Sequence, residues 1–131
     1  MKFHHIGIIV KNFSYGLKIH KKIYKNLKHS KVIIDKKIGV KIRFIYGEDK
    51  IIYELITPFG KSSPITKLLK DKTFILNHIA YKEKKFDKKI KNFKKNNFLQ
   101  ISKPMRAKAF KGKRVVFFMT PLRHIIELIE D

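Results

Sequence analysis

Two segments of the sequence each place a single carboxylate inside an apolar run. Glu54 and Glu127 are both followed by Leu-Ile, and they lie 73 residues apart in the chain. A carboxylate in such a run is costly to bury unless it is paired or bound to a cation. The same offset of 73 residues relates His5 to His78, each in an apolar, strand-like segment. One His and one Glu thus recur together, and they supply four potential metal ligands.

The same offset relates further apolar positions across the whole half-chain. The matching pairs cover a helix face and a middle strand: Phe13 and Phe86, Leu17 and Ile90, Ile42 and Val115, and Phe44 and Phe117. Two short motifs could match by chance, but a shared register over so many positions indicates an internal duplication. We therefore predict two tandem βαβββ units and an α+β fold, with a mixed sheet that curls around a metal cleft.

Local patterns place the elements of the first unit. Residues 3–10 are rich in β-branched residues and predict a strand. Asn12 or Ser14 can cap the helix that follows, which turns one apolar face inward. After it we expect a strand and turn, and then two strands joined by a polar turn as an antiparallel pair, over 30–40, 41–46 and 51–56.

The second unit repeats this order after a linker. Breaking residues are dense in 57–64, and a short helix is expected over 65–69. Four later strands are predicted, at 74–81, 99–102, 114–119 and 124–129. One helix is predicted between the first two of them, with a face marked by Phe86, Ile90 and Phe93. The basic segment 103–112 is the expected mobile loop. The chain is then one domain, 1–131, of two repeats, 1–58 and 74–131, joined by the linker 59–73.

The predicted strands suggest how the four polar residues could meet. If the first and last strands of each unit are neighbours, two imidazoles and two carboxylates come together. This donor set suits a divalent ion such as Ni, Co, Zn, Fe or Mn, and open coordination positions would mark a catalytic site. Two alternatives stay open, because a strand Glu can face solvent at a sheet edge and a lone His can be an ordinary core residue.

The composition limits the classes of partner. The chain has 131 residues, no Cys and a formal net charge of +22, with four Arg among its 32 basic residues. The lack of Cys excludes disulfides and thiolate zinc sites. Few Arg and no recognisable motif disfavour a specific nucleic-acid partner, and the many lysines fit a general compositional bias. A positive surface also attracts a phosphorylated cofactor such as coenzyme A, or an acidic carrier protein.

The sequence shows no sign of a membrane or secreted protein. No apolar run approaches the roughly 20 residues of a membrane span. The strand pattern begins at the N-terminus, without a secretory signal. We therefore expect a cytoplasmic protein that does not bind membranes.

These residues resemble a known family. Tandem βαβββ units with His on the first strands and Glu on the last are similar to the vicinal oxygen chelate (glyoxalase, bleomycin-resistance and dioxygenase) superfamily, and most similar to methylmalonyl-CoA epimerases. The resemblance implies that a divalent ion (Ni, Co, Zn, Mn or Mg) is held by His5, Glu54, His78 and Glu127, and that a homodimer forms. It rests on residues 5–10, on 54–65 with their Ser-Pro-Ile end, on 77–80 and on 126–130.

The resemblance also implies a reaction. In this superfamily a divalent ion chelates two substrate oxygens and stabilises the enolate formed when a proton leaves the carbon beside a carbonyl. The expected activity is that of an isomerase or epimerase acting on an acyl thioester of coenzyme A or of an acyl carrier protein. The alternatives are a glyoxalase I-like lactoylglutathione lyase and a non-catalytic small-molecule-binding protein. The intact set of four ligands argues against the non-catalytic alternative.

The sequence departs from the epimerases at one position. They carry a catalytic Glu just before the Gly-Val that matches Gly39-Val40, whereas this chain has Asp-Lys-Lys-Ile there, beginning at Asp35. Either Asp35 substitutes after a local shift, or Glu54 or Glu127 doubles as the base in the manner of glyoxalase I. The identity of the substrate depends on which of these holds.

Overall fold

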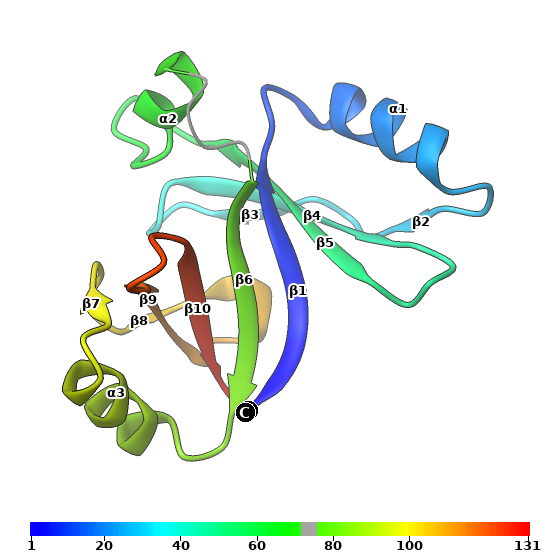
Figure 1. Cartoon of the computed structure of the whole chain (residues 1–131). Helices are drawn as coiled ribbons and strands as arrows, with labels where there is room; N and C mark the ends of the chain where they lie inside the picture. The colour runs from blue at the N-terminus through cyan, green and yellow to red at the C-terminus, as the bar shows by residue number, and fades with distance from the viewer. Residues whose placement is uncertain (72–75) are drawn as a thin grey trace. The chain divides into compact units, whose positions relative to one another are not determined.

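The structure is a computed structural model that describes residues 1–71 and 76–131 (Figure 1). Its helices and strands confirm the predicted α+β class and the predicted tandem units. In chain order the elements are β1 (Lys2–Ile9), α1 (Phe13–Ile23), β2 (Lys28–His29), β3 (Ile33–Asp35), β4 (Val40–Tyr46), β5 (Ile52–Pro58), α2 (Thr66–Asp71), β6 (Leu76–Glu83), α3 (Phe86–Lys95), β7 (Leu99–Gln100), β8 (Met105–Arg106), the 3₁₀ helix η1 (Lys108–Phe110), β9 (Arg114–Met119) and β10 (Ile125–Glu130).

The chain divides into two compact units. The N-terminal unit is His5–Asn77, and the C-terminal unit is His78–Asp131 together with Met1–His4. The strand β1 therefore contributes its first residues to the C-terminal unit and the rest to the N-terminal unit.

Parallel and antiparallel pairs mix in the sheet of the N-terminal unit. Its strands lie in the order β2-β4-β5-β1, and β3 also pairs with β4. β4 and β5 form the predicted antiparallel hairpin, whereas β5 runs parallel to β1. A parallel pair requires a crossover connection, and the chain from α1 through β4 provides it. The first and last strands of this unit are thus neighbours.

The helix α1 begins where its sequence predicts a boundary. Asn12 has an extended backbone, and its side-chain oxygen accepts a hydrogen bond from Tyr15 N at 2.8 Å. This satisfies one of the free N–H groups at the start of a helix. Of the two predicted caps, Asn12 is the one used. The apolar face of the helix packs on the sheet, where Phe13 and Leu17 lie against a core of Val10, Ile45 and Leu55.

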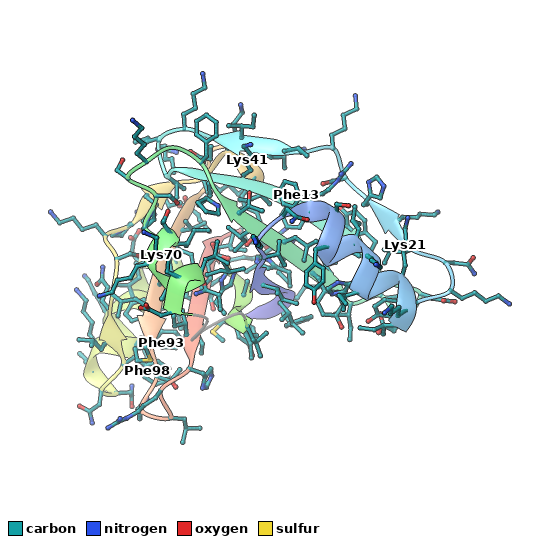
Figure 2. The ribbon with its side chains drawn as sticks, turned by 90° about the horizontal axis from the view of Figure 1, so that it is seen from above. Phe13, Lys21, Lys41, Lys70, Phe93 and Phe98 are labelled. Carbon is teal, nitrogen blue, oxygen red and sulfur yellow. The ribbon has the colours of Figure 1, made fainter. Side chains whose placement is uncertain are left out.

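The C-terminal unit repeats this architecture. Its strands lie in the order β6-β10-β9-β7, with β8 also paired to β9. β10 runs parallel to β6 and antiparallel to β9. The three residues predicted to mark the helix face all belong to the core of the unit, which also includes Phe118 and Leu128; they are Phe86, Ile90 and Phe93. The Phe93 ring also stacks on that of Phe98 with centroids 4.4 Å apart, and Figure 2 labels both residues.

One segment follows the prediction and another differs from it. The strand and turn expected over 30–40 are β3 and a turn that follows Asp35 and ends at Gly39, where φ is +82°. The segment 103–112, expected as a mobile loop, contains β8 and η1. It is more regular than predicted because Met105 pairs with Val115 of β9 and Ala107 is buried.

The remaining linker elements follow the prediction only in part. The short helix predicted at 65–69 is α2, Thr66–Asp71. The strand predicted from 74 is described only from Leu76, since 74 and 75 lie outside the described residues, as do 72 and 73 of the predicted linker.

Candidate functional site

In the N-terminal unit, strand pairing brings His5 to Glu54. Glu54 of β5 pairs with Gly7 of the parallel strand β1, and His5 precedes Gly7 by two residues. Side chains two residues apart point to the same face of a strand, so His5 and Glu54 are diagonal neighbours on one face. His5 Nε2 lies 3.2 Å from Glu54 Oε2, and the two side chains are 0% and 4% exposed.

The C-terminal unit forms the same pair in the same register. Glu127 of β10 pairs with Ala80 of β6, two residues after His78. His78 Nε2 lies 3.4 Å from Glu127 Oε2, with side chains 1% and 4% exposed. Neither carboxylate faces solvent at a sheet edge, which excludes the plainest alternative for both residues. Each His–Glu pair is built by the first and last strands of its unit.

A phenylalanine completes each pair. Phe44 pairs with Glu54 across β4 and β5, and Phe117 pairs with Glu127 across β9 and β10. Phe44 meets the His5 ring edge-to-face, with centroids 5.9 Å apart and planes at 78°. Phe117 meets His78 in the same way, at 5.4 Å and 73°. Neither residue was predicted as part of a site, although the offset of 73 residues matches Phe44 to Phe117.

Each pair removes a carboxylate and an imidazole from water, and this must be compensated. Two donors that each lie about 2.0–2.2 Å from one metal ion are roughly 3–3.5 Å apart at ordinary coordination angles. The separations of 3.2 and 3.4 Å lie in this range. They also fit an ion pair between a protonated His and its Glu. Within each unit, the geometry therefore suits a share of a metal site or a structural ion pair.

Asp35, the alternative base, has a structural role in a turn. It is 5% exposed and pairs with Val40 across β3 and β4. Its Oδ1 accepts a hydrogen bond from Ile38 N at 3.1 Å, and its carbonyl accepts one from Gly39 N at 2.8 Å. An Asp commonly stabilises a turn in this way.

The other described histidines make local contacts. His20 is buried, and its Nδ1 donates to the Gly16 carbonyl at 2.8 Å. His124 is exposed in the turn before β10, with Nδ1 3.0 Å from Thr120 Oγ1. The ring of His4 lies edge-to-face on Phe110 at 5.6 Å.

Comparison with known proteins agrees with this architecture. A sequence model described as the Glyoxalase/Bleomycin resistance protein/Dioxygenase superfamily matches residues 4–117. The chain therefore belongs to the Glyoxalase/Bleomycin resistance protein/Dioxygenase superfamily. No curated protein matches the sequence significantly.

Several solved structures share the fold. A hypothetical protein from Bacillus halodurans C-125 is 27% identical, with a TM-score of 0.84, covering 99% of this chain and 94% of that one. Methylmalonyl-CoA epimerase from Mycobacterium tuberculosis is 19% identical, with a TM-score of 0.78, covering 98% of this chain and 87% of that one. A methylmalonyl-CoA epimerase in complex with methylmalonyl-CoA and NH4+ is 17% identical, with a TM-score of 0.78, covering 99% and 94%. At these identities the epimerases show a common fold.

Proposed function

We propose that the protein is a metal-dependent isomerase or epimerase that removes a proton from the carbon beside the carbonyl of an acyl thioester. The observation that carries this proposal is the buried His–Glu pair, repeated in the same register in both units. Ligands that act together must both be present, which gives a reason for the pair to occur in both units.

The donor set fits a divalent metal ion. In this proposal the two pairs together supply the ligands of such an ion: His5, Glu54, His78 and Glu127, all of them buried. Two imidazoles and two carboxylates are ligands that Ni, Co, Zn or Mn accept. When bound, such an ion would supply Lewis-acid stabilisation of the negative charge that develops on substrate oxygens.

The side chains of the protein would do the rest of the chemistry. In each His the Nε2 atom faces the paired Glu, so ligation through Nε2 needs no reorientation of the ring. Phe44 and Phe117 hold the two imidazoles at a fixed angle. In this proposal a carboxylate, Glu54 or Glu127, takes the proton from carbon. A proton delivered to the opposite side of that carbon gives the epimer, and a proton delivered to a neighbouring carbon gives an isomer.

An acyl thioester is the substrate class that the similarities favour. One of the structures with the same fold is an epimerase bound to methylmalonyl-CoA. The net charge of +22 also attracts the phosphates of coenzyme A or an acidic carrier protein.

The turn at Asp35 keeps a second candidate reaction open. Asp35 binds the backbone of its own turn, which favours a ligating carboxylate as the base. A glyoxalase I-like lyase, which uses a ligand in this way, is therefore the alternative to an epimerase. Hydrogen exchange on an acyl thioester and conversion of the glutathione hemithioacetal of methylglyoxal distinguish the two reactions.

Metal content tests the site directly. We expect protein purified without an affinity tag to hold a divalent ion, and His78→Ala to lose it. The matched control is His29→Ala, since His29 is exposed and lies outside both pairs. A protein that stays empty when Ni, Co, Zn, Mn and Mg are offered would contradict the proposal.

Deuterium exchange tests the reaction. We expect the wild-type protein to exchange the α-proton of methylmalonyl-CoA, or of a related acyl thioester, with solvent deuterium. Asp35→Asn identifies the base: exchange persists if a ligating Glu takes the proton, and it stops in a folded, metal-loaded variant if Asp35 does. Absence of exchange on all thioesters by the metal-loaded protein would reject the thioester reaction.

A further inference from the structure

The solvent-facing half of α1 has an unusual distribution of side chains. Its apolar residues at positions four apart, Tyr15, Ile19 and Ile23, are 59%, 36% and 64% exposed. Residues four apart form a row along a helix, so these three make one continuous apolar strip. We call it the apolar row. An exposed strip of large apolar side chains is typical of a surface that binds a partner.

A second row, of lysines, runs beside the apolar row. Lys18, Lys21 and Lys22 are exposed on the same half of the helix, and α1 contains no acidic residue. Within the described part of the chain, no carboxylate forms an ion pair with any of the three lysines. Figure 2 labels Lys21 on α1. The exposed half of α1 thus offers apolar contact along one side and positive charge along the other.

The second repeat provides an internal comparison. The offset of 73 residues takes the lysine row of α1 onto lysines of α3, at 91, 94 and 95. It takes the apolar row onto polar residues, Lys88, Asn92 and Asn96. The two helices therefore carry the same lysine row, whereas the apolar row of α1 is replaced by polar residues on α3.

A hollow lies at the Tyr15 end of the apolar row. It has a volume of about 590 Å³ and is lined mainly by apolar side chains, including Ile9, Val10 and Leu69, with Lys11 and Lys70 among its polar residues. Figure 2 labels Lys70 on α2. A hollow of this size accepts a protruding group of a partner. A flat lipid surface would leave it unfilled.

The hollow also shares a strand with the His5–Glu54 pair. Ile9 and His5 point to the same face of β1, four residues apart, which is about 13 Å along a strand. A substrate arm that enters at the hollow therefore has only a short distance to cover to reach His5.

These observations favour one class of partner. The lysines require an acidic surface, and the apolar row requires apolar side chains on that surface, which a nucleic-acid backbone lacks. A second copy of this chain would bring the same +22 charge and the same lysines. We propose that α1 and the hollow beside it form a docking surface for a small acidic protein that carries the acyl thioester on a flexible arm. This inference rests on the proposed function, because it names the carrier of the substrate.

Direct binding tests the docking surface without relying on activity. The probe is an acidic bacterial acyl carrier protein with its thiol arm attached, titrated into this protein in a calorimeter. The variant Tyr15→Lys/Ile19→Asn/Ile23→Asn gives α1 the residues that α3 carries, and we expect it to weaken binding at least about tenfold. Lys18→Glu/Lys21→Glu/Lys22→Glu should do the same and reduce the salt dependence of binding.

The matched control is Lys91→Glu/Lys94→Glu/Lys95→Glu, which makes the same change of charge on α3. We expect this control to bind the carrier protein within about twofold of wild type after correction for its charge. Equal weakening by the α1 and α3 charge variants would overturn the proposal, since the attraction would then be general. Retention of binding by the apolar-row variant would also overturn it. So would α1-dependent binding to anionic lipid vesicles without any binding of the carrier protein.

Kinetics separate this inference from the proposed function. The same acyl group is presented on coenzyme A and on the carrier protein. The variant Ile19→Asn/Ile23→Asn, which leaves Tyr15 at the hollow intact, should raise KM for the carrier-bound substrate at least about tenfold and leave KM for the coenzyme A substrate unchanged. Exchange of the coenzyme A thioester without any binding of the carrier protein would reject the docking surface and leave the proposed function intact. Binding of the carrier protein without exchange of either thioester would reject the proposed function alone.

Discussion

The two units agree closely on one face of their sheets and differ on the other. On the face with the polar pairs, His5, Glu54 and Phe44 correspond to His78, Glu127 and Phe117 in the same strand register. The edge-to-face contact of each Phe with its His recurs as well. The structure therefore repeats the strand register and the aromatic contact of each pair.

The helix face of the two sheets differs in chemistry. In the C-terminal unit, Phe93 lies edge-to-face on Phe118 at 5.3 Å in an apolar core. The equivalents of these residues in the N-terminal unit are His20 and Ile45. A polar cluster surrounds His20, in which the Tyr24 hydroxyl donates to Asp49 Oδ2 at 2.7 Å and lies 2.9 Å from Tyr53 Oη. Burial, the hydrogen bond with Tyr53 and the one with Asp49 raise the pKa of Tyr24, in that order.

This difference indicates which features the two units need in common. The proposed ligation of a metal ion would restrict the paired face of each unit. The helix face only has to bury one side of a helix, and either aromatic packing or a polar cluster can do so. The outer surface of α1 has departed furthest, since its apolar row has only polar equivalents on α3.

The largest predicted effect breaks the symmetry of the two pairs. We expect Glu54→Gln and Glu127→Gln each to lower kcat for α-proton exchange by about 10²–10⁴-fold, the usual contribution of a general base or an essential ligand. Substitution of the residue that acts as base should remove activity while the protein retains its metal. Substitution of a residue that is only a ligand should remove the metal as well. Metal content and kcat, measured on both variants, decide between these roles. Full activity in either variant would show that its carboxylate has no part in the reaction.

The next prediction concerns the two cores. Phe93→Ala removes a buried ring that contacts both Phe98 and Phe118, and should lower the free energy of unfolding by about 3–5 kcal/mol. His20→Ala, at the equivalent position, should cost less, about 1–3 kcal/mol, chiefly by loss of its hydrogen bond to Gly16. Urea denaturation of both variants measures the difference. The reverse order would mean that the polar cluster stabilises the fold more than the aromatic core does.

A smaller effect is expected at the polar cluster. Tyr24→Phe keeps the buried ring and removes only the hydroxyl, so the free energy of unfolding should fall by no more than about 1 kcal/mol. Asp49 should lose the main cause of its lowered pKa, which is the hydrogen bond from Tyr24. NMR titration of the Asp49 carboxyl then shows its pKa moving up in the variant. An unchanged pKa would exclude this bond in solution.

The smallest predicted effect lies in a charge network found on β9 and β10. Arg114 donates to Glu130 at 2.8 Å and to Asp87 at 2.9 Å, and its equivalent in the first repeat is Lys41. The hydrogen bonds from Arg114 lower the pKa of Glu130 from 4.5 to about 2. Because the pKa of Glu130 is lowered in the folded state, the Arg114–Glu130 pair stabilises the fold fully above pH 4.5. This stabilisation disappears as the pH falls toward 2.

Substitution of Glu130 measures this contribution. Glu130→Gln should lower the free energy of unfolding at neutral pH by at most about 1 kcal/mol, since the pair is partly exposed and screened by salt. The difference in free energy of unfolding between wild type and variant should become smaller as the pH falls below 4.5. A gap that stays constant over this range would mean that the ion pair does not stabilise the fold.

Much of the fold could be predicted because the duplication supplied each pattern twice. The offset that relates His5 to His78 also located the helix face of Phe86 and the strands that carry Glu54 and Glu127. The meeting of His and Glu in each unit depended on its first and last strands being neighbours, and each unit forms this pair. The role of Asp35 could not be predicted from the sequence, since it depends on a hydrogen bond that the carboxylate accepts from the backbone N–H of Ile38. The apolar row was missed because Tyr15, Ile19 and Ile23 match polar residues in the second repeat.

The division of β1 between the two units has a consequence for any attempt to separate the two halves of the chain. Met1–His4 belong to the unit formed by His78–Asp131, whereas the next residue, His5, already belongs to the other unit. A cut after Asn77 would leave these four residues covalently attached to the wrong fragment. The shorter fragment would lack a piece of its own structure, and the longer one would carry that piece as a free end. We therefore expect the two fragments to depend on each other when expressed separately, and to recover their structure only when mixed.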